Sequence, residues 1–291
     1  MGDIPSYSTA IEKAIKDLIA SSELFNKISQ LAPWQYPIIQ PMDKCYSYEN
    51  AQKLLVFSYN ITKHNIQVDN RNPRPIPINP PMFDVVQAID VRVDTVLVNV
   101  VYLLYSTTLN MTVICFTGTY NRPLWIVDFD YPQLVPTGIN NYVEGMKVHG
   151  GFWKLYIKVN TQIYNFLEKY ANNNTQVLIT GISLGGGMSS LCMYDLYGRT
   201  INNFALKNII HYSFASPRVF NTIGANYYDY LHIFSYRVVN GSDIVPALPF
   251  PLMPIDEDFT HVNEQIYFNM NLGTYGDNHI TAYITKYNVN P

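Results

Sequence analysis

The feature that most constrains the fold is the segment Gly181-Ile182-Ser183-Leu184-Gly185, which joins two different kinds of sequence. Before it runs the short apolar stretch 177–180, and after it comes a stretch typical of a helix, up to Tyr197. A strand that turns into a helix at Gly-x-Ser-x-Gly is the setting of a nucleophile elbow, in which the serine hydroxyl is exposed at the edge of a sheet. Glycines on both sides allow the strand and the helix to approach without Cβ clashes. The alternative is an ordinary turn of small residues between a strand and a helix.

The same segment predicts where negative charge is stabilised. Leu184 is expected to be the first residue of the helix, and the backbone N–H groups of a helix N-terminus attract anions. We therefore expect Ser183 to be a nucleophile and the N–H of Leu184 to face a developing oxyanion.

The composition narrows the class of protein. The chain has 291 residues, a formal net charge of −3, 14% charged residues and 48% hydrophobic residues. These values fit a globular α/β domain and give no basic stripe for nucleic acid. The longest apolar run, 96–105, is well short of the roughly 20 residues of a membrane-spanning helix. Three cysteines lack metal-ligand spacing, and the N-terminus lacks a secretory pattern, so we expect an intracellular protein.

Strands and helices alternate along most of the chain. Strands are expected at 95–104, 112–116, 177–181, 209–215, 235–239 and 265–270, and helices at about 9–28, 49–61, 151–170 and 184–197. Such alternation predicts an α/β fold with a mostly parallel sheet covered by helices on both faces. We expect a single domain over 1–291, in which an N-terminal helical region and proline-rich connection (1–90) precede a catalytic core (91–291).

A serine nucleophile needs a base beside it and an acid that orients the base, and in α/β-hydrolases they follow the serine in the order acid, then histidine. Asp243 is the preferred acid because it follows the strand 235–239 and so lies at the carboxyl end of a strand. Asp195 lies within the helix after the elbow and is expected to point away. The other acids before residue 259 are Asp229, Asp256 and the Glu257–Asp258 cluster.

Two histidines follow Asp243 in the sequence. His279 is placed in a loop, Gly276-Asp277-Asn278-His279, from which a side chain can be presented to Ser183. His261 immediately precedes a strand, a position that is more often structural. We therefore prefer His279 as the base.

Beyond the elbow, four blocks in order carry a resemblance to a known family. They are Phe116-Thr117-Gly118-Thr119 continuing to Leu124–Asp128, Val148-His149-Gly150-Gly151-Phe152, Ala215-Ser216-Pro217-Arg218-Val219, and Arg237–Pro249. With the elbow, these blocks resemble the class 3 lipases, of the fungal triacylglycerol lipase type. The likeness spans about residues 95–285, and the first 90 residues match only loosely.

The resemblance implies an α/β-hydrolase fold and a catalytic triad of Ser183, Asp243 and His279. It implies that the N–H of Thr119 is the second half of the oxyanion hole, beside that of Leu184. It also places a short lid at 120–128, where the side chains expected to contact substrate are Leu124, Trp125 and Ile126. An alternative of equal weight is that these three are ordinary core residues.

Three positions depart from the family pattern. Ile182 stands where a histidine usually precedes the nucleophile. Thr117 stands where an arginine usually precedes the oxyanion glycine, so a structural ion pair is expected to be missing. The aromatic residue after the final histidine, Tyr283, comes four positions on instead of three. None of these changes removes a catalytic group, but they leave the range of substrates open.

Together these features predict a hydrolase of carboxylic esters that acts on a lipid or small ester substrate, with transient contact to a lipid surface. A phospholipase A1 or acyltransferase with the same machinery is an alternative, and so is a non-catalytic lipase-like protein that binds a lipid or a partner. We expect no cofactor, no metal, no nucleic-acid partner and no transmembrane segment.

Overall fold

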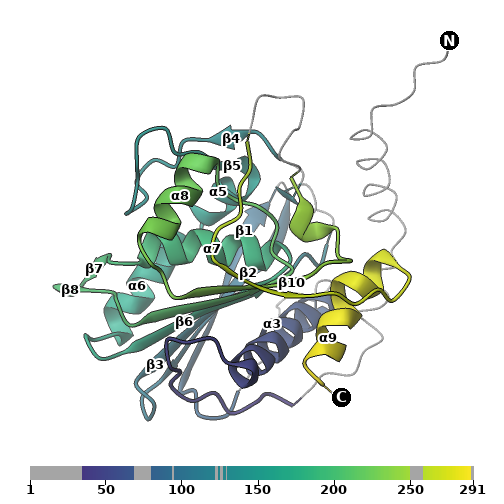
Figure 1. Cartoon of the computed structure of the whole chain (residues 1–291). Coiled ribbons are helices and arrows are strands. Elements are labelled where there is room, and N and C mark those ends of the chain that lie inside the picture. Colours follow the sequence, from purple (N-terminus) through teal and green to yellow (C-terminus); the bar gives the residue numbers. More distant parts are fainter. Residues whose placement is uncertain are drawn as a thin grey trace.

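A seven-stranded sheet forms the centre of the structure, a computed structural model that describes residues 35–68, 80–93, 95–121, 124, 127–128, 130–249 and 258–289. Its strands, in spatial order, are β1(Val85–Val93), β2(Val96–Ser106), β3(Met111–Phe116), β6(Gln176–Ile182), β9(Ile209–Phe214), β10(Ser235–Asn240) and β11(Glu264–Phe268). This sheet lies in the middle of the molecule (Figure 1). The pairs β1–β2 and β2–β3 are antiparallel, and the pairs from β3 to β11 are parallel. The expected α/β fold with a mostly parallel sheet is therefore confirmed.

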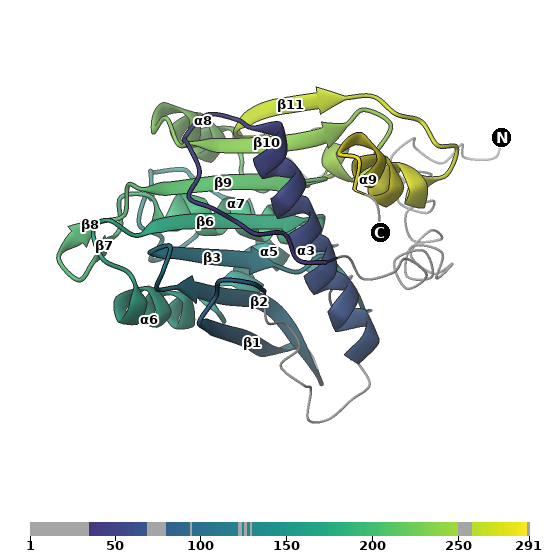
Figure 2. The ribbon, with the colours of Figure 1, turned by 90° about the horizontal axis from the view of Figure 1, so that it is seen from below.

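Helices cover both faces of this sheet, as Figure 2 shows. One face carries α3(Tyr48–Val68) and α9(Ala282–Lys286), and the other carries α5(Gly150–Tyr156), α6(Asn160–Tyr170), α7(Leu184–Leu196) and α8(Thr222–Tyr230). Short pairs β4(Gln133–Leu134)–β5(Val148–His149) and β7(Thr200–Ile201)–β8(Phe204–Ala205) lie outside the sheet, as do the turns η1(Val245–Ala247) and η2(Asp277–Thr281). Among the described residues, no helix is both long and apolar enough to cross a membrane.

The central strand β6 explains why the sheet is covered twice. All seven of its residues are buried. Val177 and Ile179 belong to the core under α7, whereas Leu178 and Ile182 belong to the core under α3. A strand that buries both of its faces reads as a continuous apolar run, which is the pattern of a parallel sheet between two helical layers.

Several expected elements differ in extent from those observed. The expected helix 151–170 is interrupted, because the amides of Lys158 and Val159 bond to carbonyls only three residues back and so tighten the chain between α5 and α6. Strand β1 was not expected, and α3 continues beyond 61 to Val68. The expected helix near 9–28 and most of the proline-rich connection lie outside the described residues.

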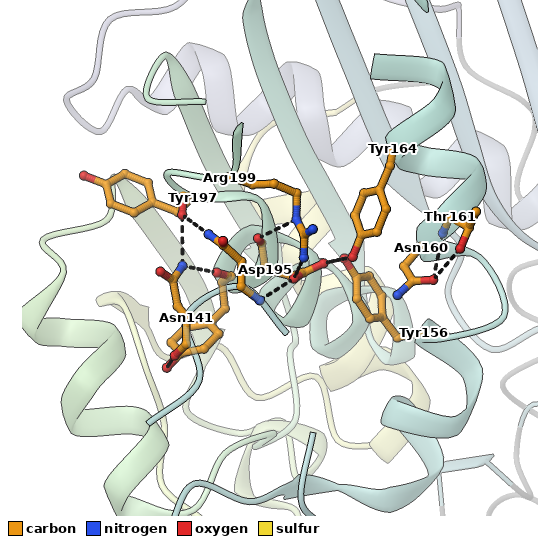
Figure 3. Close-up of polar contacts among 10 residues, drawn as sticks. Asn141, Tyr156, Asn160, Thr161, Tyr164, Asp195, Tyr197 and Arg199 are labelled. Carbon is orange, nitrogen blue, oxygen red and sulfur yellow. Dashed lines mark hydrogen bonds and ion pairs between the residues drawn. The ribbon is translucent and has the colours of Figure 1, made fainter. Parts of the chain in front are cut away.

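Asp195, at the end of α7, ties the helices of one face together (Figure 3). Its fully buried carboxylate accepts hydrogen bonds from Tyr156 of α5 (2.8 Å) and Tyr164 of α6. It also pairs with Arg199 at 2.5 Å and accepts the backbone N–H of Asn140 at 2.9 Å. A buried carboxylate with this many donors is satisfied within the protein, which fits the expectation that Asp195 is not the catalytic acid.

Candidate active site

The elbow between β6 and α7 holds Ser183 in a strained backbone conformation. Its φ is 59° and its ψ is −125°, in a region that residues with a side chain rarely adopt. The close packing of the turn explains its glycines: a Cβ atom at Gly181 would lie 2.1 Å from the carbonyl oxygen of Gly185. One at Gly185 would lie 2.5 Å from the carbonyl oxygen of Phe116. The first turn of α7 therefore packs directly on the end of β3, which brings the residues after β3 next to Ser183.

The structure brings together Ser183, His279 and Asp243, which come from three different parts of the chain. Nε2 of His279 lies 3.0 Å from Oγ of Ser183, and its Nδ1 lies 2.9 Å from Oδ2 of Asp243. All three residues are buried. Asp243 is fixed by the N–H of Val245, which donates to Oδ1 at 3.0 Å. This is the geometry of a hydroxyl nucleophile, a base and an orienting acid.

His279 lies in the helical turn η2, which leads directly into α9, and not in the loop that the sequence suggested. The loop interpretation rested on Gly276 and Asp277, and η2 instead begins at Asp277 with wide π-helical hydrogen bonding. A side chain on a helical turn is held more rigidly than one on a loop, which favours a constant distance to Ser183.

Tyr283 is a fourth member of this cluster that the sequence did not reveal as a site residue. Its hydroxyl donates to Oδ2 of Asp243 at 3.0 Å and accepts the backbone N–H of Asn240 at 3.0 Å. The side chain is fully buried, and burial raises the pKa of its hydroxyl well above the usual value, with a further rise from the neighbouring Asp243 carboxylate. The hydroxyl therefore stays protonated and is a permanent donor to Asp243.

Replacing this tyrosine should weaken the site without removing a reacting group. In Tyr283→Phe, Oδ2 of Asp243 loses one of its two donors. A hydrogen bond to a charged group contributes about 1.5 kcal/mol or more, so kcat/KM for a soluble ester should fall about 10-fold. The control is Tyr287→Phe, which removes a buried hydroxyl that bonds Tyr46 at 2.8 Å and does not contact Asp243. Equal losses of kcat/KM in the two variants would contradict the role of Tyr283 as a donor to Asp243.

The second half of the predicted oxyanion hole lies beside the elbow. Thr119 is buried, and its hydroxyl donates to Oδ2 of Asp128 at 2.7 Å. The N–H of Leu184 lies at the N-terminus of α7, where the first backbone donors have no partner within the helix. The fit of the two N–H groups to one oxygen remains a prediction.

The predicted lid is described only in part. Leu124 is fully buried, and its backbone N–H donates to the side chain of Asn121 at 3.3 Å. Trp125 and Ile126 lie outside the described residues.

Thr117, which stands where the family usually has an arginine, makes an uncharged contact. Its hydroxyl oxygen accepts a hydrogen bond from Nδ2 of Asn65 at 3.1 Å.

Asp128 gives the protein an expected dependence of stability on pH. Burial raises the pKa of its carboxyl group to about 8, an effect that the Thr119 hydroxyl only partly offsets. The folded protein thus keeps a proton that the unfolded chain releases near pH 4, so stability falls as the pH rises from about 4 to about 8. In Asp128→Asn this loss should disappear: the Tm of the variant should fall less than that of the wild type over the same interval. Parallel Tm curves would count against an Asp128 that is protonated in the folded protein.

Three other histidines have structural partners. His149 caps α5 through Phe152, and burial lowers its pKa to about 4. His211 lies between Ser189 and Ser235. His261 bonds the carbonyl of Pro246 at 2.6 Å, and burial together with two arginines lowers its pKa far below the usual value. His279 is thus the histidine that reaches Ser183. Within the described ranges, no three His, Cys, Asp or Glu side chains gather as metal ligands.

Residues 113–253 match the family described as Lipase (class 3). The lipase of Rhizomucor miehei is 34% identical over 161 residues, which are 54% of this chain and 42% of that protein. Secreted mono- and diacylglycerol lipase LIP4 of Malassezia restricta is 31% identical over 185 residues, which are 60% of this chain and 57% of that protein. The chain thus spans about half the length of the curated relatives it matches.

A solved structure gives the same result for the fold. It is that of a triacylglycerol lipase whose catalytic centre is described as a serine protease triad, and it superposes with a TM-score of 0.53 at 27% identity. The match covers 64% of this chain and 66% of that one.

One expectation is overturned by the relatives. An intracellular protein was expected, whereas the relative from Malassezia restricta and a mono- and diacylglycerol lipase of Penicillium camembertii are both named as secreted. The sequence at the N-terminus was therefore not a sound basis for locating the protein. The strand order, the elbow and the family match agree with one another: the chain has the α/β-hydrolase fold, and its residues 113–253 match the class 3 lipase family.

Proposed function

We propose that this protein is a serine carboxylic-ester hydrolase, a lipase that cleaves acylglycerols or related lipid esters. The observation that supports this most is the hydrogen-bonded chain from Ser183 through His279 to Asp243, with contacts of 3.0 and 2.9 Å. The relatives named lipase, and mono- and diacylglycerol lipase, favour the same class of substrate. Those named as secreted favour action outside the cell. We further propose that the chain acts as a single catalytic domain.

The proposed first step transfers the acyl group to the enzyme. Oγ of Ser183 attacks the ester carbonyl carbon while Nε2 of His279 takes the hydroxyl proton. Asp243 orients the imidazole and stabilises the imidazolium that forms. The N–H groups of Thr119 and Leu184 donate to the carbonyl oxygen as negative charge develops on it. When the C–O bond breaks, His279 gives its proton to the leaving alcohol and Ser183 remains acylated.

The second step releases the acid. His279 takes a proton from water as the water oxygen attacks the acyl carbon, and it returns the proton to Oγ of Ser183 as that bond breaks. The products are the free carboxylic acid and the original enzyme. Neither step calls for a metal ion or an organic cofactor.

Two measurements test this proposal. A fluorophosphonate probe should label the wild-type protein, and mass spectrometry should find the adduct on the peptide that contains Ser183. Hydrolysis should then be compared across triacylglycerol, diacylglycerol, monoacylglycerol, phosphatidylcholine and p-nitrophenyl esters of increasing chain length. A preference for phosphatidylcholine would favour a phospholipase A1 over a lipase as the function of this protein. A protein that neither reacts with the probe nor cleaves any ester would instead be a lipase-like binding protein.

A further inference from the structure

Residues 117–119, which we call the oxyanion loop because Thr119 is a predicted oxyanion donor, accept hydrogen bonds from helix α3 and donate hydrogen bonds to it. This helix lies outside the residues that match the family. The N–H of Gly118, the residue before Thr119, donates to Oγ1 of Thr62 at 2.8 Å. The Thr62 hydroxyl donates its own hydrogen to the carbonyl of Ser58 at 2.9 Å. Because a hydroxyl has one hydrogen, this bond turns the lone pairs of Thr62 towards Gly118. Thr62 belongs to α3 and is 3% exposed, so no water competes for this contact.

A second contact from the same helix holds the preceding residue. Nδ2 of Asn65 donates to Oγ1 of Thr117 at 3.1 Å, and Oδ1 of Asn65 accepts the hydroxyl of Tyr102 at 2.9 Å. Asn65 is 1% exposed and Thr117 is 0% exposed. Both ends of the Asn65 amide are thus bonded, which fixes its orientation between β2 and the oxyanion loop.

Gly118 itself has almost no free space. A Cβ atom on it would lie 3.2 Å from the carbonyl oxygen of Ile182 and 3.3 Å from Oγ1 of Thr62. The peptide before Thr119 therefore lies between the elbow on one side and α3 on the other. Thr62 therefore holds this peptide against the carbonyl of Ile182 in the elbow, and so fixes the position of Thr119 relative to the elbow.

We infer that Thr62 and Asn65 are positioning residues for the oxyanion hole, an inference that rests on the proposed ester hydrolysis. They hold the peptide that precedes Thr119, so that the N–H of Thr119 keeps a fixed direction towards the oxygen bound by Leu184. Preorganised donors of this kind cost no rearrangement when charge develops. Neither residue touches the substrate. The contribution therefore comes from α3(Tyr48–Val68), although the family match begins at residue 113.

The test is Thr62→Val, which keeps the branched shape and removes the acceptor for Gly118. With a soluble p-nitrophenyl ester, kcat should fall about 10- to 100-fold. This loss is no larger than the loss of about 100-fold or more that follows removal of a whole oxyanion donor. KM should change less than about twofold, since the ground-state carbonyl depends little on this N–H. Thr62→Ser keeps the hydroxyl and should restore most of kcat. Thr62→Cys, with a weaker acceptor, should fall between the two and serves if Thr62→Val does not fold.

The matched control is Ser58→Ala, one turn earlier on the same face of α3. Its side chain bonds the Leu54 carbonyl and Thr180, is fully buried, and does not reach the oxyanion loop. It should lower Tm yet leave kcat within about twofold of the wild type. An equal loss of kcat in Ser58→Ala and Thr62→Val, or an unchanged kcat in Thr62→Val, would overturn the inference while wild-type activity still supports the hydrolase. Absence of probe labelling and of activity in the wild type would instead refute the proposed function itself.

Discussion

Replacing Ser183 with alanine should lower kcat for ester hydrolysis by roughly four to six orders of magnitude, the loss typical of a serine nucleophile. The hydroxyl is the atom that forms the acyl-enzyme, and its proton has a direct acceptor in Nε2 of His279 at 3.0 Å. The elbow should persist, because its shape depends on glycines and backbone contacts and not on the serine side chain. The variant should therefore keep its Tm, lose labelling by the fluorophosphonate, and leave KM for any residual activity near the wild-type value.

A second Ser–His contact in the fold supplies the matched control. Oγ of Ser189 lies 2.8 Å from Nε2 of His211, whose Nδ1 lies 2.5 Å from Oγ of Ser235. This arrangement resembles a triad but has a hydroxyl in place of the acid, and both Ser189 and His211 are 0% exposed. Burial lowers the pKa of His211 to about 3, so the ring is neutral. Ser189→Ala should reduce stability and leave kcat unchanged; substantial activity in Ser183→Ala would show that another group carries the reaction.

The second large effect concerns the turn itself. In Gly181→Ala the added Cβ would lie 2.1 Å from the carbonyl oxygen of Gly185 and 2.3 Å from its carbonyl carbon. These are backbone atoms in the first turn of α7, so relief requires the helix to move away from β6. We expect the free energy of unfolding to fall by about 3 kcal/mol or more, at the upper end for an overpacked interior. Urea unfolding measures this change, and probe labelling measures whether Ser183 keeps its reactivity.

Gly198→Ala separates this clash from the general cost of replacing a glycine. Gly198 has a φ of 73°, and a Cβ there would meet nothing within 4 Å. Its replacement should cost only the conformational strain of an alanine in the left-handed region, about 1–2 kcal/mol. If Gly181→Ala were no more destabilising than Gly198→Ala, close packing would not be the reason for the glycine at the elbow.

The parts of the molecule that the sequence predicted well are those decided by neighbouring residues. Strand β6, the turn at Ser183 and helix α7 follow one another directly, and each carries its own local pattern. Asp243 was found because strand ends meet at one edge of a parallel sheet, which is a rule of topology. The preference for His279 over His261 agrees with the observed contact to Ser183.

The parts that the sequence did not predict depend on contacts between distant segments. Tyr283 bonds Asp243 across 40 residues, and Thr62 bonds Gly118 across 56. The periodicity of apolar residues in the sequence does not predict such pairs, because the same tyrosine or threonine would suit many buried positions. Strand β1 was missed although exposed Asp90 and Arg92 alternate with buried apolar residues in its second half, which is the pattern of an edge strand with one buried face.

The order of the strands in the sheet determines how the protein would behave if it were shortened to the residues that match the family. A polypeptide of residues 113–253 would contain Ser183 and Asp243 but would end before His279. It would lack β1, β2 and α3, so that the remnant of β3 would present an unpaired edge and an uncovered apolar face to the solvent. Such edges recruit other chains. The residues that match the family reflect common ancestry. Expressed alone, they would form a polypeptide that aggregates and has an incomplete triad.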